Sequence, residues 1–327
     1  MVQKINIAVL GAGYWGTKLI REYIALSKKE ENIRLCGVAD ISKERLSKIK
    51  SEFNLPSKLL YRDYKDILKN DSITAVHISL PNELHYEATI NSLEAGKDIL
   101  LEKPMALKSS EAFKLARKAE KSGAILLVGH IFRFNNAVNK CKELIRDGLV
   151  GDIKILELRW TTWMNKLPER DIIFDLAPHP VDIVNNLTEE WPRKVYSIAK
   201  SYYRGRSGLE ESAFIFGEMH DDITMKITLS WIHPGPKVRG INAVGNKGMV
   251  FVDALNQKII FYDTKGIERR IEVEKNNTIE SMIRHFIDRI LNHSPPINSA
   301  LIGAMTVLVL EKIRMSIDKG RPIEVVT

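Results

Sequence analysis

The sequence predicts an α/β fold in two domains, with a doubly wound parallel sheet first and an α+β domain with an open, mainly antiparallel sheet second. Up to Gly129, short β-branched apolar runs alternate with amphipathic stretches, a pattern typical of βαβ units. A glycine-rich turn joins the first apolar run to the first amphipathic stretch. After about Gly129, longer alternating strands follow, as in antiparallel sheets. We therefore expect domains at residues 1–128 and 129–327.

The first domain is expected to contain strands separated by helices whose apolar residues recur every three or four positions. The expected strands are 5–10, 33–39, 75–79, 98–101 and 125–128. The expected helices are 17–26, 43–53, 85–95 and 110–122.

The second domain is expected to begin with a helix at 136–147, which Gly148 closes. Turn residues then separate alternating segments. The expected strands are 153–161, 194–203, 212–217, 224–232, 240–244, 248–252, 258–262 and 269–273. Helices are expected again at 278–291 and 301–319.

Composition narrows the class of protein. The chain has 327 residues, of which 44% are hydrophobic and 28% charged, and this composition is typical of a globular protein. Basic and acidic residues are interleaved despite the net charge of +8, so we expect no nucleic-acid partner. The apolar run 301–310 is about half the length of a membrane span, and the N-terminus shows no leader. Because Cys36 and Cys141 have no metal-site spacing, we expect a reduced, cytoplasmic setting and no metal.

A glycine-rich motif follows the first expected strand and opens the first expected helix: Gly11-Ala12-Gly13-Tyr14-Trp15-Gly16. In this context the glycines form a tight turn that admits a dinucleotide pyrophosphate at the helix N-terminus, as in a Rossmann domain. Asp40 ends the second strand, where an acidic residue binds ribose hydroxyls and favours NAD. Two alternatives stay open. Asp40 caps the next helix, or Lys43 or Arg45 binds the 2′-phosphate of NADP.

Two further segments end parallel strands, at the edge of the sheet where open α/β folds bind ligands. Ser79, Leu80, Pro81, Asn82 and His85 follow the third core strand, and Glu102 and Lys103 follow the next. We expect these residues to contact the cofactor, with Lys103 at its nicotinamide end. The alternative is structural, with prolines ending strands, Asn82 capping a helix and Lys103 exposed to solvent.

At this point the sequence resembles the Gfo/Idh/MocA family of oxidoreductases over nearly its whole length. The matching elements are Ala8 to Gly16, Pro81 to His85, Glu94 to Pro104 and Asp175 to Asp182. The resemblance implies that Lys103 is catalytic, that Pro104 follows a cis peptide bond, and that Asp175 and His179 form the substrate-side dyad.

Chemistry supports these roles, because oxidation of an alcohol by hydride transfer needs a base for the hydroxyl proton and a cation near the alkoxide. On a helix, Asp175 and His179 lie one turn apart, so that the carboxylate can orient the imidazole. Asp182 shares that face and can contact substrate hydroxyls. Two alternatives remain, a metal site and helix capping beside a core histidine.

A finer resemblance connects the chain to the branch of the family that acts on nucleotide sugars. It lies in Val128 to Val138, Leu229 to Ile232, Lys237 to Arg239 and Gly245 to Gly248. It implies His130, Arg133, Arg159 and Lys237 as substrate contacts beside Lys103, Asp175, His179 and Asp182. Asn136 and the pair Arg170-Asp171 depart from the pattern of that branch and leave the substrate open.

The expected function is therefore hydride transfer between nicotinamide and a secondary hydroxyl of a sugar ring, most simply that of a UDP-N-acetylglucosamine-like nucleotide sugar. The alternatives are a dehydrogenase of free sugars or inositols, and a non-catalytic dinucleotide sensor. Like relatives of the family, the chain is expected to form a homodimer or homotetramer, through apolar faces of its second sheet that one helix layer leaves uncovered.

Overall fold

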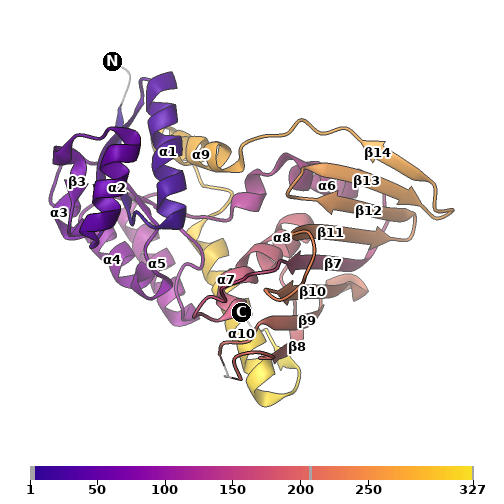
Figure 1. Ribbon diagram of the computed structural model, residues 1–327. Coiled ribbons are helices and arrows are strands. Elements are labelled where there is room, and N and C mark those ends of the chain that lie inside the picture. The colour runs from indigo at the N-terminus through magenta and orange to yellow at the C-terminus, as the bar shows by residue number, and fades with distance from the viewer. Residues whose placement is uncertain (1–3, 206–207, 326–327) are drawn as a thin grey trace. The chain divides into compact units, whose positions relative to one another are not determined.

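The computed structural model describes residues 4–205 and 208–325. Within them the chain forms two compact units, one of residues 4–129 and 279–305, the other of 130–205, 208–278 and 306–325 (Figure 1). Residues 279–305 thus group with the first unit. A single domain boundary after residue 128 assigns them to the second.

The first unit contains a parallel sheet in the order β3-β2-β1-β4-β5-β6. Its strands are β1 (Ile5–Leu10), β2 (Ile33–Ala39), β3 (Leu60–Tyr61), β4 (Ala75–Ile78), β5 (Asp98–Leu101) and β6 (Leu126–Val128). Its helices are α1 (Tyr14–Lys29), α2 (Lys43–Phe53), α3 (Tyr64–Leu68), α4 (His85–Glu94), α5 (Ser109–Ser122) and all but the first residue of α9 (Thr278–Asn292). The chain runs outward from β1 to β3 and returns to β4 on the other side of β1. This places a topological switch point at the carboxyl ends of β1 and β4, where doubly wound folds bind ligands.

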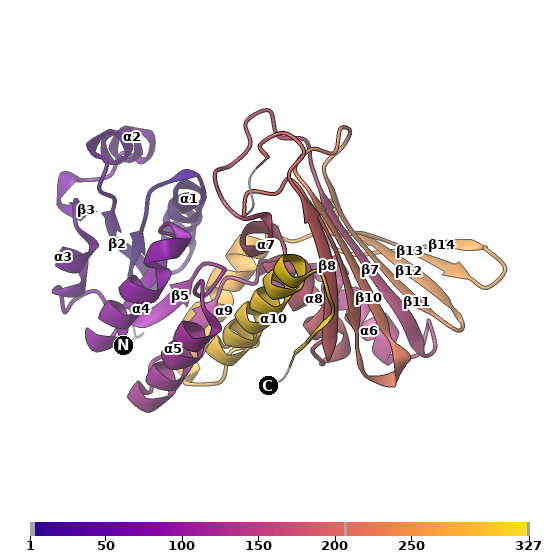
Figure 2. The same cartoon turned by 90° about the horizontal axis from the view of Figure 1, so that it is seen from below.

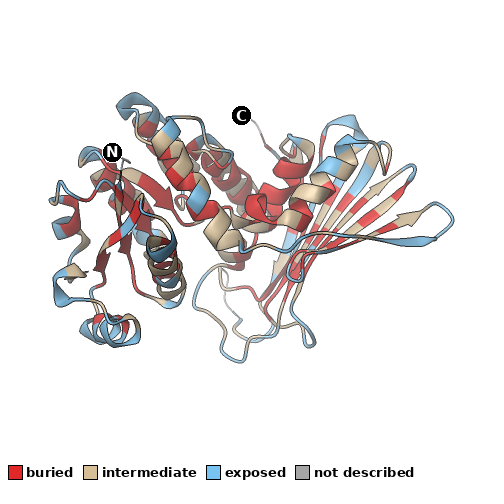
Figure 3. Cartoon of the chain, turned by 90° about the horizontal axis from the view of Figure 1, so that it is seen from above, coloured by how far each residue is buried: buried red, intermediate tan, exposed pale blue. Residues whose placement is uncertain are grey.

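The core strands of this sheet are almost wholly buried, as Figure 3 shows by colour. Buried strands in a parallel sheet are expected to be apolar on both faces, and β1, β4 and β5 are nearly so. Of their polar residues, Asn6 and Asp98 are partly exposed, whereas His77 in β4 is fully buried. In this unit the sequence did not predict β3 or α3, which are too short to show a hydrophobic period.

The second unit contains a nine-stranded sheet in the order β14-β13-β12-β11-β7-β10-β9-β8-β15. Its strands are β7 (Ile153–Thr161), β8 (Lys194–Lys200), β9 (Ser212–Glu218), β10 (Thr224–Ser230), β11 (Val238–Gly245), β12 (Gly248–Asp253), β13 (Lys258–Asp263), β14 (Glu268–Ile271) and β15 (Ile323–Glu324). Its helices are α6 (Asn136–Arg146), α7 (Ile172–Leu176), α8 (Pro178–Thr188) and the part of α10 (Ala300–Lys319) from Thr306 on. Neighbouring strands are antiparallel except β7 and β10, whose parallel pairing turns the sheet from antiparallel to mixed.

The two faces of this sheet differ in what covers them. Helices α6 and α8 lie against one face, called here the helix face, and leave the opposite face bare within this unit (Figure 2). Leu156, Leu158 and Trp160 of β7 point to the helix face and are fully buried. The opposite face carries an outer patch of aromatic and aliphatic side chains 36–41% exposed, in which Tyr196 and Ile198 of β8 pair with Phe216 and Phe214 of β9.

No helix in the ranges 4–205 and 208–325 is long and apolar enough to cross a membrane. In those same ranges, no three His, Cys, Asp or Glu side chains are grouped closely enough to hold a metal ion.

Candidate active site

The glycine-rich turn of the first unit is closed by backbone contacts that only glycine permits. A Cβ on Gly11, whose φ is +104°, would come 2.3 Å from the Ser79 carbonyl oxygen, and one on Gly16 would come 1.9 Å from the Gly11 carbonyl oxygen. A Cβ on Gly13 would meet nothing within 4 Å. Gly13 precedes α1, which has neither a side-chain cap nor an acidic residue in its first turn. The open side of this turn therefore fits a dinucleotide pyrophosphate at a helix N-terminus.

Asp40 is buried at the end of β2 and connects this turn to the next helix. Its carboxylate accepts hydrogen bonds from the backbone N–H groups of Ala12 and Ser42, both at 2.9 Å. The cap of α2 is Ser42, which accepts from the Arg45 N–H, so the alternative that Asp40 itself caps this helix is wrong. The Arg45 guanidinium lies 3.5 Å from Asp40 and is largely exposed.

His85 connects the segments that follow β4 and β5. Its Nδ1 lies 2.7 Å from the carbonyl oxygen of Pro104, and its Nε2 lies 2.9 Å from that of Leu80. Burial lowers the pKa of His85, although both carbonyls oppose this effect. The Lys103-Pro104 peptide bond is cis, as the family resemblance implied. Asn82 begins a short 3-10 helix (Asn82–Leu84) and is not the cap of α4.

The proposed dyad of the second unit lies on two consecutive short helices. Asp175 belongs to α7 and His179 to α8, and Ala177 between them keeps right-handed helical dihedral angles. The α-helix is interrupted here because Pro178 and Pro180 have no N–H to donate. The chain nevertheless continues in the helical sense, with the Val181 N–H donating to the Ala177 carbonyl at 3.0 Å.

Cationic and aromatic side chains surround the dyad within this unit. An Arg170 nitrogen lies 3.2 Å from the Asp175 carboxylate. The buried Arg239 guanidinium lies over the Trp160 ring, 5.6 Å from its centroid. Burial lowers the pKa of Arg239 to about 10, and the nearby Asp175 opposes this shift.

Phe132 extends the same group of rings. It packs edge-on against both His179 and Trp160, with centroid distances of 5.2 and 5.3 Å. The helices on the helix face thus bring a carboxylate and an imidazole beside an arginine and aromatic rings.

Arg133 and Asp182, both expected to contact substrate, are paired with each other in a buried network. Arg133 Nε donates to Asp182 Oδ1 at 2.7 Å, and Arg133 Nη2 donates to Asn185 Oδ1 at 2.7 Å. His130 Nδ1 lies 3.8 Å from the same Asp182 oxygen. These contacts fix the 3-10 helix η3 (Ile131–Phe134) against α8, so they give Arg133 and Asp182 a structural role.

Arg159 and Lys237, the other expected substrate contacts, lie elsewhere. Arg159 is exposed between Leu158 and Trp160 on β7, and successive side chains of a strand point to opposite faces. Arg159 therefore faces away from the helix face and contacts His233. Lys237 is exposed in the loop before β11, two residues from Arg239.

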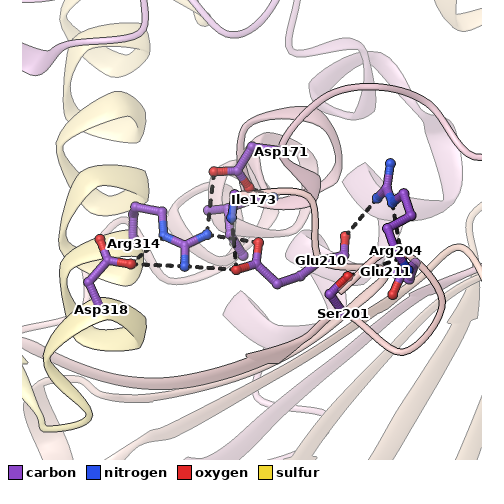
Figure 4. Close-up of polar contacts among 9 residues, drawn as sticks. Asp171, Ile173, Ser201, Arg204, Glu210, Glu211, Arg314 and Asp318 are labelled. Carbon is purple, nitrogen blue, oxygen red and sulfur yellow. Dashed lines mark hydrogen bonds and ion pairs between the residues drawn. The ribbon is translucent and has the colours of Figure 1, made fainter. Parts of the chain in front are cut away.

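A group of ion pairs supports the segment that precedes α7 (Figure 4). Arg314 of α10 binds Glu210 with both terminal nitrogens, at 3.0 and 3.1 Å, and lies 3.6 Å from Asp171. Asp171 caps α7 by accepting the Ile173 N–H at 2.7 Å. Burial raises the pKa of Asp171, while this hydrogen bond and Arg314 oppose the shift.

A second pair stabilises the same segment from the other side. The Arg204 Nε donates to the fully buried Glu211 at 3.0 Å, and Arg204 Nη1 donates to the Pro168 carbonyl at 2.5 Å. The backbone N–H groups of Tyr202 and Arg204 also donate to Glu211. Together the two arginines hold both ends of the stretch from Pro168 to Asp171, and so the start of the helix that carries Asp175.

The sequence interpretation missed Trp160, Arg170 and Arg239 as neighbours of the dyad. For Arg239 a signal existed, because its position in the alternating pattern of its strand is that of inward-facing residues such as Ile241. In the sequence, Arg170 stands out only as a departure from the family pattern.

Comparison with known proteins defines the class. Residues 5–130 match an oxidoreductase family described as having an NAD-binding Rossmann fold. Residues 138–251 match the C-terminal domain of the same family. The chain therefore belongs to the Gfo/Idh/MocA family of oxidoreductases, as the motifs indicated.

Curated relatives are distant. The chain is 28% identical to a 2,7-anhydro-N-acetylneuraminate hydratase of Mediterraneibacter gnavus over 167 residues, which are 51% of this chain and 42% of that protein. It is 22% identical to a myo-inositol 2-dehydrogenase of Thermotoga maritima over 98% of both chains. In the first of these matches, the chain spans less than half the length of the relative.

Solved structures share the whole fold. A UDP-N-acetylglucosamine 3-dehydrogenase from Acidithiobacillus ferrooxidans superposes with a TM-score of 0.84, at 21% identity, over 97% of this chain and 98% of that one. An aldose-aldose oxidoreductase from Caulobacter crescentus gives 0.87, at 20% identity, over 98% of this chain and 100% of that one.

Proposed function

We propose that the protein is an NAD-dependent dehydrogenase that oxidises a secondary alcohol of a sugar ring, with nucleotide sugars as the substrate class. The observation that carries the proposal is that Asp175 and His179 lie one helical turn apart on two consecutive short helices. Arg239, Trp160 and Phe132 pack around them. A carboxylate and an imidazole one helical turn apart are what a proton relay needs. The buried rings of Trp160 and Phe132 support these groups from behind, Trp160 under Arg239 and Phe132 against the His179 ring.

In the proposed mechanism, the ring of His179 accepts the proton of the substrate hydroxyl as the alkoxide develops. Asp175 orients the imidazole and stabilises its protonated form. The Lys103 ammonium stabilises the alkoxide. A bound nicotinamide ring would supply the hydride acceptor. Gly13 and the first turn of α1 would hold the pyrophosphate of the dinucleotide, and Asp40 would accept hydrogen bonds from its ribose.

Preference for NAD over NADP is also part of the proposal. Asp40 is buried with one oxygen on the Ala12 N–H and one on the Ser42 N–H. Its negative charge at this position opposes a 2′-phosphate. Arg45, the residue most able to bind that phosphate, lies beside Asp40 at 3.5 Å.

A second candidate, oxidation of a free sugar or inositol, has specific support. A diphosphate needs cationic ligands, and the buried pairing of Arg133 with Asp182 leaves that arginine committed to the protein. Arg159 points away from the helix face. The match to the inositol dehydrogenase also extends over the full chain.

A substrate panel separates the two candidates. UDP- and dTDP-sugars, free aldoses and inositols are each incubated with NAD, and NADH formation is followed by absorbance. We expect turnover with a nucleotide sugar. Turnover with inositols or free sugars alone would replace the first candidate with the second, and no turnover with any of them would contradict both.

Variants of the proton relay test the mechanism on whichever substrate is active. Lys103→Met and His179→Asn should lower kcat by about 10²- to 10⁴-fold while NAD binding, measured by calorimetry, stays nearly unchanged. Asp175→Asn should lower kcat by the same factor or less, because the imidazole stays in place. Near-wild-type turnover of the Lys103 and His179 variants, with chemistry rate-limiting, would show that the mechanism is wrong.

A further inference from the structure

A row of four polar side chains, three of them buried, crosses the first unit between α1 and the end of β5. Its members are Tyr23 of α1, His77 of β4, Glu102 after β5 and Trp15 in the first turn of α1. Tyr23 and His77 are fully buried, and Glu102 is 7% exposed. Glu102 directly precedes Lys103, and Trp15 belongs to the glycine-rich motif.

The members of the row contact one another in sequence. The Tyr23 hydroxyl lies 3.0 Å from His77 Nδ1, and the two rings meet edge-on at 88°. His77 Nε2 lies 3.4 Å from Glu102 Oε1. The Trp15 Nε1–H donates to the same oxygen at 2.6 Å. The Glu102 carboxylate is therefore connected to α1 at two positions about two turns apart. Trp15 contacts it directly, and Tyr23 is connected to it through His77.

Glu102 is the carboxylate on which the contacts of the row converge. The side chains around Glu102 hold its pKa below the usual value although burial alone would raise it, and His77 contributes most to this, ahead of Trp15 and Lys103. An ionised Glu102 only accepts hydrogen bonds, as it does from the Trp15 Nε1–H. The Tyr23 hydroxyl and His77 Nδ1 share a hydrogen bond at the other end of the row. Burial raises the pKa of Tyr23, and the charge of Glu102 adds to this shift.

Stability alone does not account for these residues. His77 occupies the third position of the strand Ala75–Ile78, all of which is buried in a parallel sheet. Apolar residues are the rule at such positions, and replacing buried charged networks by apolar side chains is often neutral or stabilising. Buried polar groups that local packing does not favour are typical of functional positions.

The carboxylate of Glu102 has little freedom to move. A Cβ on Gly129, at the end of the neighbouring β6, would come within 2.9 to 3.1 Å of its three carboxyl atoms. Gly129 thus gives Glu102 its space, and the hydrogen bond from Trp15 orients the carboxylate, with His77 Nε2 3.4 Å from the same oxygen.

We propose that Tyr23 and His77 are positioning residues that act through Glu102, and that Glu102 couples the glycine-rich turn, through Trp15, to the Lys103 turn. The inference rests on the proposed function for its effect on turnover. The orientation of Trp15 by Glu102 does not depend on that function.

The test compares Tyr23→Phe and His77→Leu with His77→Gln, whose amide can accept from Tyr23 and donate to Glu102. The matched control is Tyr64→Phe, which removes another tyrosine hydroxyl of the same unit, 2.9 Å from Asn91 and outside the row. In protein without cofactor, the indole N–H resonance of Trp15 is assigned among the five tryptophans by its loss in Trp15→Phe. Steady-state kinetics and calorimetric NAD titration follow.

In Tyr23→Phe and His77→Leu, we expect the Trp15 resonance to shift and kcat to fall about three- to tenfold, the scale of one hydrogen bond. NAD affinity should change by less than about twofold, because Asp40 and the glycine-rich turn are intact. His77→Gln should restore both signals toward wild type, and Tyr64→Phe should alter neither.

Folded Tyr23→Phe and His77→Gln proteins allow this comparison even if His77→Leu does not fold. An unchanged Trp15 resonance in Tyr23→Phe, or an equal kcat loss in Tyr64→Phe, would overturn the inference. If the wild type turns over no substrate of the panel, the proposed function fails, while the Trp15 resonance still decides whether Tyr23 and His77 orient Glu102.

Discussion

Replacing Arg314 by Met should destabilise the second unit through the carboxylate that it leaves behind. Arg314 binds Glu210 with two hydrogen bonds, and the side chains are only 16% and 6% exposed. Without the guanidinium, the Glu210 carboxylate keeps the hydrogen bond from the Gly208 N–H at 3.1 Å. The nearby Asp171 carboxylate adds a charge of the same sign.

The size of the effect follows from that burial. Removing one partner of a buried ion pair costs about 3 to 5 kcal/mol, and the partial exposure of Arg314 favours the lower end. At about 2 °C per kcal/mol for a large domain, the melting temperature should fall by about 6 °C. Arg21→Met is the matched control, since its pair with Glu52 is 58% and 31% exposed and should contribute less than about 1 kcal/mol.

The pH dependence supplies a sign that can be checked. Arg314 and backbone donors hold the pKa of Glu210 below its usual value of 4.5, against burial, which would raise it. A depressed folded pKa stabilises above the unfolded pKa, and this contribution is lost as pH falls through the folded value. The stability gap between wild type and Arg314→Met should therefore narrow below about pH 4.5.

Thermal unfolding followed by circular dichroism at several pH values measures this gap. Glu210→Gln in the Arg314→Met background should recover part of the loss, because it removes the unpaired charge. A melting temperature like that of the Arg21→Met control, or a gap that widens in acid, would refute the reasoning.

Three further predictions concern binding and assembly. Asp40→Ala should weaken NAD binding and reduce the ratio of NAD affinity to NADP affinity, both measured by calorimetry. Equal or tighter binding of NADP by the wild type would contradict the assigned preference. Arg239→Met should lower kcat/KM about tenfold or more, while Arg159→Met stays near wild type, because only Arg239 lies on the helix face. The outer patch should bury itself against a second copy, so light scattering should give an oligomeric mass that Phe214→Lys reduces, and a monomeric wild type would refute this.

Much of the fold was predictable because local signals and tertiary burial agree. The bounds of β1, β2, β5, β7 and α2 are those expected from the sequence. The helix α1 begins three residues earlier than predicted, because the glycine-rich turn ends at Gly13, which is the N-cap residue, and the helix starts at Tyr14. The parallel pairing of β7 with β10 was not predictable, because alternation along a strand gives its buried face but not its neighbour.

The polar row in the first unit marks where sequence reasoning stopped. Trp15 and Glu102 are 87 positions apart, and Tyr23 and His77 are 54 apart. No periodic pattern connects residues at such separations, and only the parallel pairing of β1, β4 and β5 brings them together.

The sheet face on which each arginine lies could have been predicted from alternation alone. Leu156, Leu158 and Trp160 define the buried face of β7 and place Arg159 on the other face, and its contact with substrate stays a prediction. Arg239 pairs with Trp160 across the two strands, so the same alternation places its guanidinium beside the dyad. A charge on the buried face of a strand is costly unless polar groups compensate it, and Arg239 Nη1 donates to the carbonyl oxygens of Val238 at 2.8 Å and Thr161 at 3.4 Å, with the charge of Asp175 nearby. The candidate functional arginine is therefore the one that breaks the apolar pattern, because an arginine that conforms to it, as Arg159 does, needs no partner beyond water.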